Sequence, residues 1–359
     1  MENRSAAFVI SLAMCGALGA CRQGANEGAR QQEAAKAPAG GAVNAPGAAA
    51  SSFPQIYERV SPAVVSVNAT RVARASPITD YFSGGPGGGQ PMVESMSAGS
   101  GFFISAEGHI LTNNHVVGDA NQVAVVLRDG RELPARVIGR DPATDLAVLR
   151  VEGRGFPHVT FSAAANPRVG EAVIAIGNPF GLGTTATHGI VSAYGRNIGS
   201  PFVDFVQLDA AINQGNSGGP TFNAQGEVVG VNTAIFSPSG GSVGIGFAIP
   251  ASTANSVAQQ VMRSGRVERG FIGASLADLP RAAPGGGAMV AAVMAGAPAA
   301  RAGLRPGDII TAVDGREVKD ATDVIRGVAA ARSGQVLPLA IIRGGRTATV
   351  NVSVQRRPS

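Results

Sequence analysis

Three polar side chains, His115, Asp145 and Ser217, have the types and the chain order that can make a serine nucleophilic. A serine hydroxyl is a poor nucleophile near neutral pH. It needs an imidazole that takes its proton and a buried carboxylate that fixes the tautomer and orientation of that imidazole. His115 ends a Thr-Asn-Asn-His stretch, Asp145 opens Asp-Leu-Ala-Val-Leu, and Ser217 precedes Gly-Gly-Pro. Together they predict acyl transfer from a substrate to the serine.

The order of these residues discriminates between the arrangements in which serine hydrolases occur. The stretch Gly215–Gly219 also matches the G-x-S-x-G turn of α/β-hydrolases, in which the acid and the histidine follow the serine. All four histidines of this chain precede Ser217, which excludes that fold. The subtilisin order needs an aspartate well before the histidine, and only Asp80, beside a Gly/Pro-rich stretch, precedes His115. The order His, Asp, Ser of the chymotrypsin fold remains.

Length and composition indicate more than one folded unit. The chain has 359 residues, of which 45% are hydrophobic and 15% are charged, which is ample for buried cores. The net charge of +5 is carried by scattered arginines, because lysine occurs only at positions 36 and 319. Without a basic cluster or a G-x-x-x-x-G-K-[ST] loop, we expect neither a nucleic-acid partner nor the use of ATP. We also expect no cofactor and no metal.

The first 21 residues have the character of a targeting segment. Ser5 to Ala20 is a small and apolar run, short for a membrane-spanning helix. Leu18-Gly-Ala-Cys21 resembles a bacterial lipobox, which predicts that Cys21 is the lipidated first residue of the mature protein. The alternative is an ordinary secretory signal cleaved near Ala20, which leaves Cys21 an exposed thiol. Because the other cysteine, Cys15, lies inside this segment, no disulfide can stabilise the folded part.

The remaining chain divides by pattern into a linker and two folded units. Residues 22–52 contain almost no large apolar side chain and predict a disordered Ala/Gly/Pro linker. From residue 53, short Val- and Ile-rich runs alternate with turn residues, as at 128–131, whose Asp-Gly is a hairpin signal. Many short strands predict a barrel or sandwich, with a loop at 83–89 and a closing helix at 252–263.

Beyond this helix, residues 270–354 predict a smaller unit of strands and two helices. A proline at the start and Gly303 behind it suit a short helix at 298–302. A second helix is predicted at 321–332, because Val324, Ile325 and Val328 recur on one face. The last hairpin is expected from strands at 336–342 and 347–354.

These features resemble the HtrA/Deg family of serine proteases. The resemblance covers about residues 53–355 and implies a mainly β fold, with a chymotrypsin-like double β-barrel at 53–265 and a smaller PDZ domain, a β-sandwich with two helices, at 266–355. One PDZ-like segment follows the barrels, so the chain is similar to the members with a single PDZ domain. The motifs that carry the resemblance are Gly99–Phe102, Leu111–Val117, Asp145–Leu149, Gly177–Gly181, Asp209–Asn213, Gly215–Pro220 and Gly246–Pro250.

The resemblance assigns roles around the scissile bond. It implies that His115 is the general base, Asp145 the orienting carboxylate and Ser217 the nucleophile. The backbone N–H groups of Gly215 and Ser217, with Asn216 between them, would form the oxyanion hole, which favours a tight turn of small residues. Position 214, where the family has Pro or Arg, is Gln214 in this chain.

Further residues follow from the same resemblance. Ile212, Ala234 and Ile235 would line a primary specificity pocket without an acidic group, which implies a preference for a small aliphatic residue before the scissile bond. Arg196 would couple the PDZ domain or a partner subunit to the oxyanion loop. Other polar residues are expected to be structural, in turns, on the surface or in loops: Asp141, Asp209, His109, His158 and His188.

The PDZ segment would bind peptide C-termini. The loop at 269–273 is similar to the loop whose backbone N–H groups receive a terminal carboxylate, and an incoming peptide would add beside it as a strand. The residues implied in this groove are Gly270, Phe271, Ile272, Gly273, Ile325 and Val328.

The leading hypothesis is an ATP-independent serine endopeptidase that cleaves misfolded or unfolded cell-envelope proteins and uses its PDZ domain for substrate capture or allosteric activation. The alternative is a chaperone or peptide-binding protein in which proteolysis is secondary, although the presence of all three triad residues argues against a purely binding protein. We expect a location in the bacterial periplasm with a lipid anchor in the membrane. The family also implies a homotrimer formed through Phe53 and Tyr57.

Overall fold

The computed structural model describes residues 52–74, 92–164, 167–178, 183–213, 215–238, 241–280 and 286–356. The targeting segment with Cys21, nearly all of the linker and the loop at 83–89 lie outside these residues. The chain divides into compact units at 1–48 and 49–359, and every element named below belongs to the second. Within the described ranges no helix has both the length and the apolar character needed to cross a membrane.

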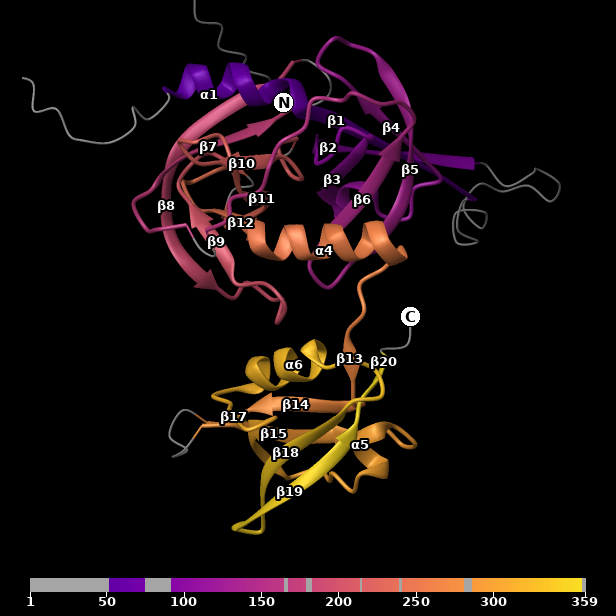
Figure 1. Cartoon of the computed structure of the whole chain (residues 1–359), viewed down its shortest axis with the longest axis vertical. Helices are drawn as coiled ribbons and strands as arrows, with labels where there is room; N and C mark the ends of the chain where they lie inside the picture. The colour runs from indigo at the N-terminus through magenta and orange to yellow at the C-terminus, as the bar shows by residue number, and fades with distance from the viewer. Residues whose placement is uncertain are drawn as a thin grey trace, which may run out of the picture. The chain divides into compact units, whose positions relative to one another are not determined.

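Six antiparallel strands of the first half close into a barrel in the order β1-β2-β3-β6-β5-β4 (Figure 1). The Asp-Gly signal at 128–131 forms the expected hairpin between β4 and β5, where the N–H of Leu127 donates to the carbonyl of Arg131 at 2.9 Å. Gly130 takes a positive φ of 84° there, which favours glycine. The strands are β1 (Val64–Arg74), β2 (Met92–Phe103), β3 (His109–Asn113), β4 (Gln122–Val126), β5 (Glu132–Asp141) and β6 (Leu146–Val151).

A second closed barrel follows in the order β10-β11-β12-β9-β8-β7. Strand β12 is buried along its whole length and β7 is buried after its first residue, in keeping with their apolar sequences. Two six-stranded barrels confirm the predicted mainly β, chymotrypsin-like fold class. The strands are β7 (Ala172–Gly177), β8 (Thr185–Arg196), β9 (Phe205–Leu208), β10 (Pro220–Phe222), β11 (Val228–Ile235) and β12 (Gly246–Pro250).

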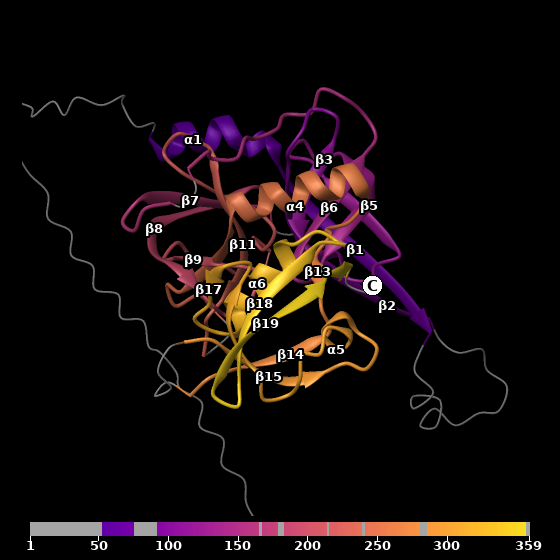
Figure 2. The same ribbon diagram turned by 60° about the horizontal axis from the view of Figure 1, so that its bottom comes forward.

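Helices join the two barrels. Helix α4 (Ala251–Ser264) contacts β5 and β6 of the first barrel and β11 and β12 of the second, and both views show it lying along them (Figures 1 and 2). It ends at Gly265, whose φ of 73° suits a glycine C-cap. Helix α1 (Phe53–Val60) was not predicted from the sequence, although Gln55 accepts a hydrogen bond from the N–H of Ser52 at its start.

The elements after α4, residues 270–356, are called the C-terminal unit below. Its main sheet has the strand order β14-β15-β16-β18-β19, with β17 paired to β16. Strand β14 is therefore an edge strand. Helix α6 (Ala321–Ala330) packs on this unit and ends before the predicted position 332, because the backbone of Ala331 is already extended. The other elements are β13 (Gly270–Phe271), β14 (Ala274–Asp278), β15 (Ala288–Val293), α5 (Pro298–Arg301), β16 (Ile309–Val313), β17 (Arg316–Glu317), β18 (Val336–Arg343), β19 (Arg346–Ser353) and β20 (Gln355–Arg356).

Candidate active site

The three predicted catalytic residues come from different connections of the two barrels. His115 lies in α3 (Asn114–Val117), a single turn directly after β3. Asp145 ends the connection between β5 and β6, so both residues belong to the first barrel. Ser217 lies in the turn before β10 of the second barrel. Chemistry between them therefore requires the two barrels to meet.

The structure joins His115 to Asp145 by two hydrogen bonds. The backbone N–H of His115 donates to Oδ1 at 2.9 Å, and the ring Nδ1 lies 2.7 Å from Oδ2. Asp145 takes a φ of 57°, unusual for a residue with a side chain, and its carbonyl accepts from Asn114 N at 3.0 Å and from Asn113 Nδ2 at 2.9 Å. With Nδ1–H donating to an ionised carboxylate, Nε2 of the neutral ring is left to accept a proton.

Thr233 contributes a hydrogen bond to the carboxylate of Asp145, a role that the sequence did not predict. Its Oγ1 donates to Oδ2 of Asp145 at 2.8 Å, although it lies on β11 of the second barrel. The carboxylate thus receives hydrogen bonds from the ring, from the backbone of His115 and from the opposite barrel. The sequence signal was limited to its place beside Ala234 and Ile235, which pointed to the specificity pocket.

The turn around Ser217 presents two free amides. Gly215 and Gly218 take positive φ angles of 106° and 82°, so the turn depends on glycine. The N–H of Asn216 donates to the carbonyl of Asn213 at 3.2 Å. Among the described residues, the N–H groups of Gly215 and Ser217 have no acceptor. These are the two amides predicted to bind an oxyanion, and the amide of Asn216 is engaged elsewhere.

His115 and Ser217 do not share a hydrogen bond within the described part of the chain. Catalytic hydrogen bonds are often long in structures without substrate and shorten when it binds. The structure therefore brings His115 and Asp145 together and places Ser217 on a turn that presents the amides of Gly215 and Ser217. The hydrogen bond between the imidazole and the serine hydroxyl is not formed among the described residues.

The predicted specificity residues separate into two groups. Ile212 is 1% exposed and packs with Ala175 and Ala210, and the half-buried Ile235 lies against this small apolar cluster. A Cβ on Gly246 would lie 2.7 Å from Ile212, so a glycine is required on that side. Ala234 packs instead against the main core of the barrels. The cluster is apolar, which suits a small aliphatic side chain.

The predicted peptide groove is partly core. Ile272 and Val328, 5% and 6% exposed, belong to the core of the C-terminal unit, whereas Phe271 and Ile325 are half-buried. Gly270 must lack a side chain, because a Cβ would lie 2.1 Å from the carbonyl of Val328. The remaining member, Gly273, has a φ of 74°. In the described residues neither its N–H nor that of Ile272 has an acceptor.

Arg196 is the last residue of β8, and its predicted coupling role stays a prediction. Its Nε donates to the side chain of Gln207 on neighbouring β9 at 3.1 Å. Arg326 of α6 connects the C-terminal unit to the barrels. Its guanidinium donates to both carboxylate oxygens of Asp204 at 2.7 and 2.8 Å and to the carbonyl of Pro201 at 2.6 Å.

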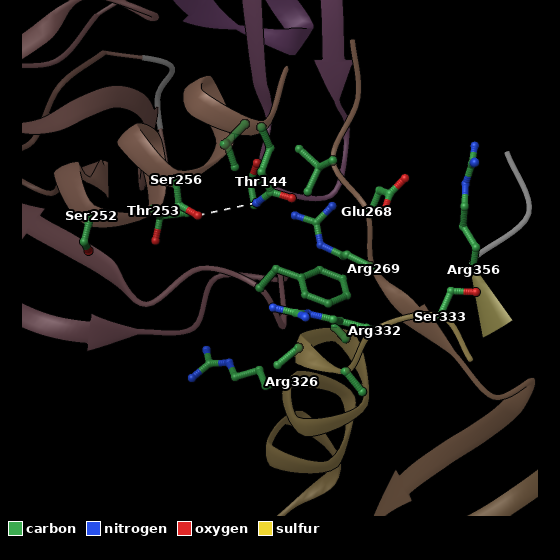
Figure 3. Close-up of a pocket in the computed structure, with 17 residues that line it drawn as sticks. Thr144, Ser252, Thr253, Ser256, Glu268, Arg269, Arg326, Arg332, Ser333 and Arg356 are labelled. Atoms are coloured by element: carbon green, nitrogen blue, oxygen red, sulfur yellow. Dashed lines mark hydrogen bonds between the residues drawn. The ribbon is translucent and has the colours of Figure 1, made fainter. Parts of the chain in front are cut away.

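A second ion pair lies at the segment that joins α4 of the barrels to the C-terminal unit. Arg269 donates to both oxygens of Asp141 at 2.6 Å and stacks over Phe202. Asp141 is thus more than the turn residue expected from sequence. Arg269 and Arg326 line a cavity of about 780 Å³ that includes none of the predicted catalytic residues (Figure 3).

The remaining polar residues have structural partners. Asp209 accepts a hydrogen bond from the N–H of Ile190 at 2.6 Å. His109 and His188 lie on strands rather than in loops. The hydroxyl of Ser105 lies 2.8 Å from Nδ1 of His109, and the ring of Phe53 stacks on the ring of His188 with 5.1 Å between the ring centroids. Burial lowers the pKa of His109. His158 is exposed in a loop, as expected.

Comparisons with known proteins identify the domain families of the chain. Residues 99–231 match the trypsin-like peptidase domain family and residues 270–354 match the PDZ domain family. A probable periplasmic serine endoprotease DegP-like of Rhizobium meliloti is 42% identical over 364 residues, covering 89% of this chain and 72% of the relative. The protein of that name from Brucella suis is 45% identical over 354 residues, covering 86% and 69%.

Solved structures are similar over the same region. The HtrA-type protease AlgW with a decapeptide matches with a TM-score of 0.75 and 40% identity, covering 86% of this chain and 99% of that chain. The serine endoprotease from Yersinia pestis matches with a TM-score of 0.69 and 36% identity, covering 86% and 99%.

Proposed function

Because the chain belongs to the HtrA-type family of serine endoproteases, we propose that it cleaves unfolded or misfolded proteins of the bacterial periplasm without ATP. The observation that carries this proposal is the pair formed by His115 and Asp145, with Nδ1 at 2.7 Å from the carboxylate. That contact leaves Nε2 as the basic atom of the site. Ser217, on a glycine turn with two free amides, is the nucleophile that such a base would serve.

The proposed reaction is acyl transfer followed by hydrolysis. His115 takes the proton of the Ser217 hydroxyl as Oγ attacks the scissile carbonyl, and Asp145 stabilises the imidazolium that forms. The N–H groups of Gly215 and Ser217 donate to the oxyanion of the tetrahedral intermediate. His115 then protonates the leaving amine, and a water molecule, activated in the same way, hydrolyses the acyl-enzyme.

Substrate selection is proposed to rest on the apolar cluster beside the serine turn. Ile212 and Ile235, together with Ala175 and Ala210, offer no charge to a side chain that enters. A small aliphatic residue before the scissile bond would bury apolar surface there, whereas a charged one would lose its hydration without a partner. Unfolded chains expose such residues, because folding normally buries them.

The C-terminal unit is proposed to bind peptide C-termini by strand addition. Strand β14 is the sheet edge, so its outer backbone groups are available to a further strand. The free amides of Ile272 and Gly273 lie directly before it and would receive the terminal carboxylate. Phe271 and Ile325 are exposed enough to contact the last apolar side chain. This supports substrate capture or allosteric activation by a peptide.

Anchoring and assembly are part of the proposal. Cys21 would carry a lipid that holds the protein at a membrane of the periplasm. A homotrimer is proposed from the family, with Phe53 and Tyr57 as contacts. Within one chain these residues already fix α1 to the second barrel, since Phe53 stacks on His188 and Tyr57 donates to the carbonyl of Thr184 at 3.0 Å. Light scattering on the fragment from residue 53 tests the trimer.

Cleavage of casein by the wild type and by Ser217→Ala tests the function. We expect the substitution to abolish cleavage and labelling by a fluorophosphonate, and apolar C-terminal peptides to change the labelling rate of the wild type. Ser264→Ala is the matched control, because its hydroxyl lies 3.0 Å from the carbonyls of Gln260 and Arg266 at the end of α4, outside the connections that carry the three catalytic residues. Unchanged cleavage by Ser217→Ala would contradict the assignment. Suppression of aggregation by that variant would instead support a chaperone activity beside proteolysis.

A further inference from the structure

Ser100 is a fully buried polar residue that the reaction above does not use. It lies on β2 of the first barrel, in the Gly99–Phe102 motif, and is 0% exposed. Its hydroxyl nevertheless reaches the second barrel: Oγ donates to the carbonyl of Gly215 at 2.5 Å. Gly215 carries one of the two amides proposed to bind the oxyanion.

The direction of this hydrogen bond is determined by a third residue. The backbone N–H of Asn178, directly after β7, donates to Oγ of Ser100 at 2.8 Å. A hydroxyl has one hydrogen, and this N–H already occupies one of its lone pairs, so the hydroxyl hydrogen is directed to the carbonyl of Gly215. One buried hydroxyl therefore connects β2, the end of β7 and the serine turn.

The peptide unit between Gly215 and Asn216 is held at both ends. Ser100 binds its carbonyl, and the carbonyl of Asn213 accepts its N–H at 3.2 Å. The backbone N–H of Ser100 also donates to the carbonyl of Ser217 at 2.8 Å. Two carbonyls of the turn are thus fixed by one residue of the opposite barrel. The peptide units that contain them directly follow the amides of Gly215 and Ser217 in the chain, so they restrict the backbone that orients those amides.

Close packing around Ser100 depends on glycine. A Cβ on Gly177 would lie 2.5 Å from Cβ of Asn216 and 2.9 Å from Oγ of Ser100. A Cβ on Gly218 would lie 2.3 Å from the carbonyl oxygen of Ser100. That carbonyl also accepts from Thr112 Oγ1 at 2.7 Å. The hydroxyl cannot shift without moving the turn.

We propose that Ser100 is a positioning residue that holds the oxyanion hole in its competent form from across the seam of the two barrels. It does not touch substrate. Its hydroxyl keeps the peptide unit after Gly215 in one orientation, so that the amides of Gly215 and Ser217 point to the site where charge develops. This inference rests on the proposed function and adds a residue that acts on kcat.

Steady-state cleavage of a peptide by Ser100→Ala tests the proposal. Loss of one oxyanion donor costs 10² to 10³ in kcat, so for a loosened turn we expect kcat to fall about 10- to 100-fold while KM changes less than about twofold. Ser100→Cys, which keeps a weak donor of similar size, is expected to recover part of kcat. The inhibition constant of a peptide boronate, which imitates the tetrahedral state, should rise in Ser100→Ala by about the factor by which kcat falls.

Ser66→Ala is the matched control. Ser66 is the register partner of Ser100 on β1 and is also 0% exposed. Among the residues that the structure describes, its hydroxyl reaches only Asn68 Oδ1, at 3.4 Å. If Ser66→Ala lowered kcat as much as Ser100→Ala, general loosening of the barrel would explain the effect and the proposal would fail. Unchanged kcat in Ser100→Ala would overturn it as well.

Amide hydrogen exchange tests the contact independently of turnover. In a Ser217→Ala background, two amides should be protected: that of Asn178, which donates to Oγ of Ser100, and that of Asn216, in the peptide unit whose carbonyl Ser100 binds. Both should lose protection on Ser100→Ala and keep it on Ser66→Ala. Protection that survives Ser100→Ala would overturn the proposal. If the unchanged protein does not cleave any substrate, the proposed function fails, while the exchange of the Asn216 amide still decides whether Ser100 fixes the turn.

Discussion

Asp145 holds His115 by its backbone and by its ring at the same time, through hydrogen bonds of 2.9 and 2.7 Å to the two oxygens of one carboxylate. A carboxylate bound in this way fixes both the position of α3 and the tautomer of the imidazole. The left-handed backbone of Asp145 is part of that geometry.

Replacement of Asp145 by Asn should therefore inactivate the enzyme while leaving it folded. The amide group can donate to Nδ1, which favours the tautomer with a protonated Nε2, and we expect kcat to fall about 10⁴-fold, as in the trypsin-type triad. Peptide hydrolysis and circular dichroism measure the two effects. Asp209→Asn, in which Oδ1 can still accept from Ile190, serves as the control and should retain kcat.

Thr233→Val should lower kcat without a large change in KM. The substitution removes the hydrogen bond that reaches Asp145 from the second barrel, while the side chain keeps its shape. One neutral donor to a charged acceptor contributes about 1.5 to 3 kcal/mol, so the expected loss in kcat is about 10- to 100-fold. Thr233→Ser keeps the donor and should restore activity. Equal activity of the Val and Ser variants would contradict this role.

Removing the cation of the Arg269–Asp141 pair should destabilise the fold. Asp141 is 4% exposed, and Arg269→Gln would leave its charge without a cation. Such a loss costs about 3 to 5 kcal/mol, to be measured from urea unfolding followed by fluorescence of an attached dye. The double variant Asp141→Asn, Arg269→Gln should lose less than the sum of the single variants, since it leaves no unpaired charge. Strict additivity would argue against coupling.

Ile325→Lys should weaken the binding of peptides with apolar C-termini. A lysine on α6 beside the β14 edge would replace apolar surface by a charge, and we expect Kd to rise at least about tenfold. Fluorescence polarisation with a labelled peptide measures the change. Met289→Lys introduces the same charge on β15, where Met289 is 38% exposed, and should leave Kd unchanged. If both variants lost binding equally, the groove would lie elsewhere.

The stability of the C-terminal unit should fall in acid through Asp308. Hydrogen bonds from Arg343 at 2.6 Å hold the pKa of this carboxyl below its ordinary value of 3.8. The unfolded chain thus binds the proton at higher pH than the fold does, so the stabilisation is present above about pH 4 and is lost as the pH falls through the folded pKa. Thermal unfolding between pH 2 and 6 should give a steeper loss of Tm for the wild type than for Asp308→Asn.

Several strands and turns of the fold could be predicted from the local sequence pattern. Alternating Val and Ile runs and the Asp-Gly turn at 128–131 predicted strands and a hairpin, because both signals act between near neighbours. Helix α1 was not predicted, although Ser52 and Gln55 form a start signal and its apolar residues recur at helical spacing, because two turns are too short for that period to stand out beside the strand runs that follow. The end of α6 was predicted too late, because no glycine or proline stands between Ala330 and Arg332.

The residues that support the site from a distance could not be found in the same way. Thr233 lies far along the chain from Asp145, and nothing about a single threonine on a strand points to a carboxylate on the other barrel. Ser100 lies in a motif whose residue types assign it no role, and its hydroxyl meets the carbonyl of Gly215 only through the packing of the two barrels. The ion pair of Arg326 with Asp204 joins residues 122 positions apart, while Arg196 bonds Gln207 and its coupling role stays a prediction.

The sequence alone determined which residues can do chemistry, because residue type, chain order and glycine at constrained positions are local properties. It excluded the α/β-hydrolase and subtilisin arrangements from the positions of four histidines and Asp80. The tertiary structure decided which side chains hold them in place. Hydrogen bonds across the seam, such as those of Thr233 and Ser100, depend on distances of a few ångströms between strands that only the packing of two closed barrels brings together.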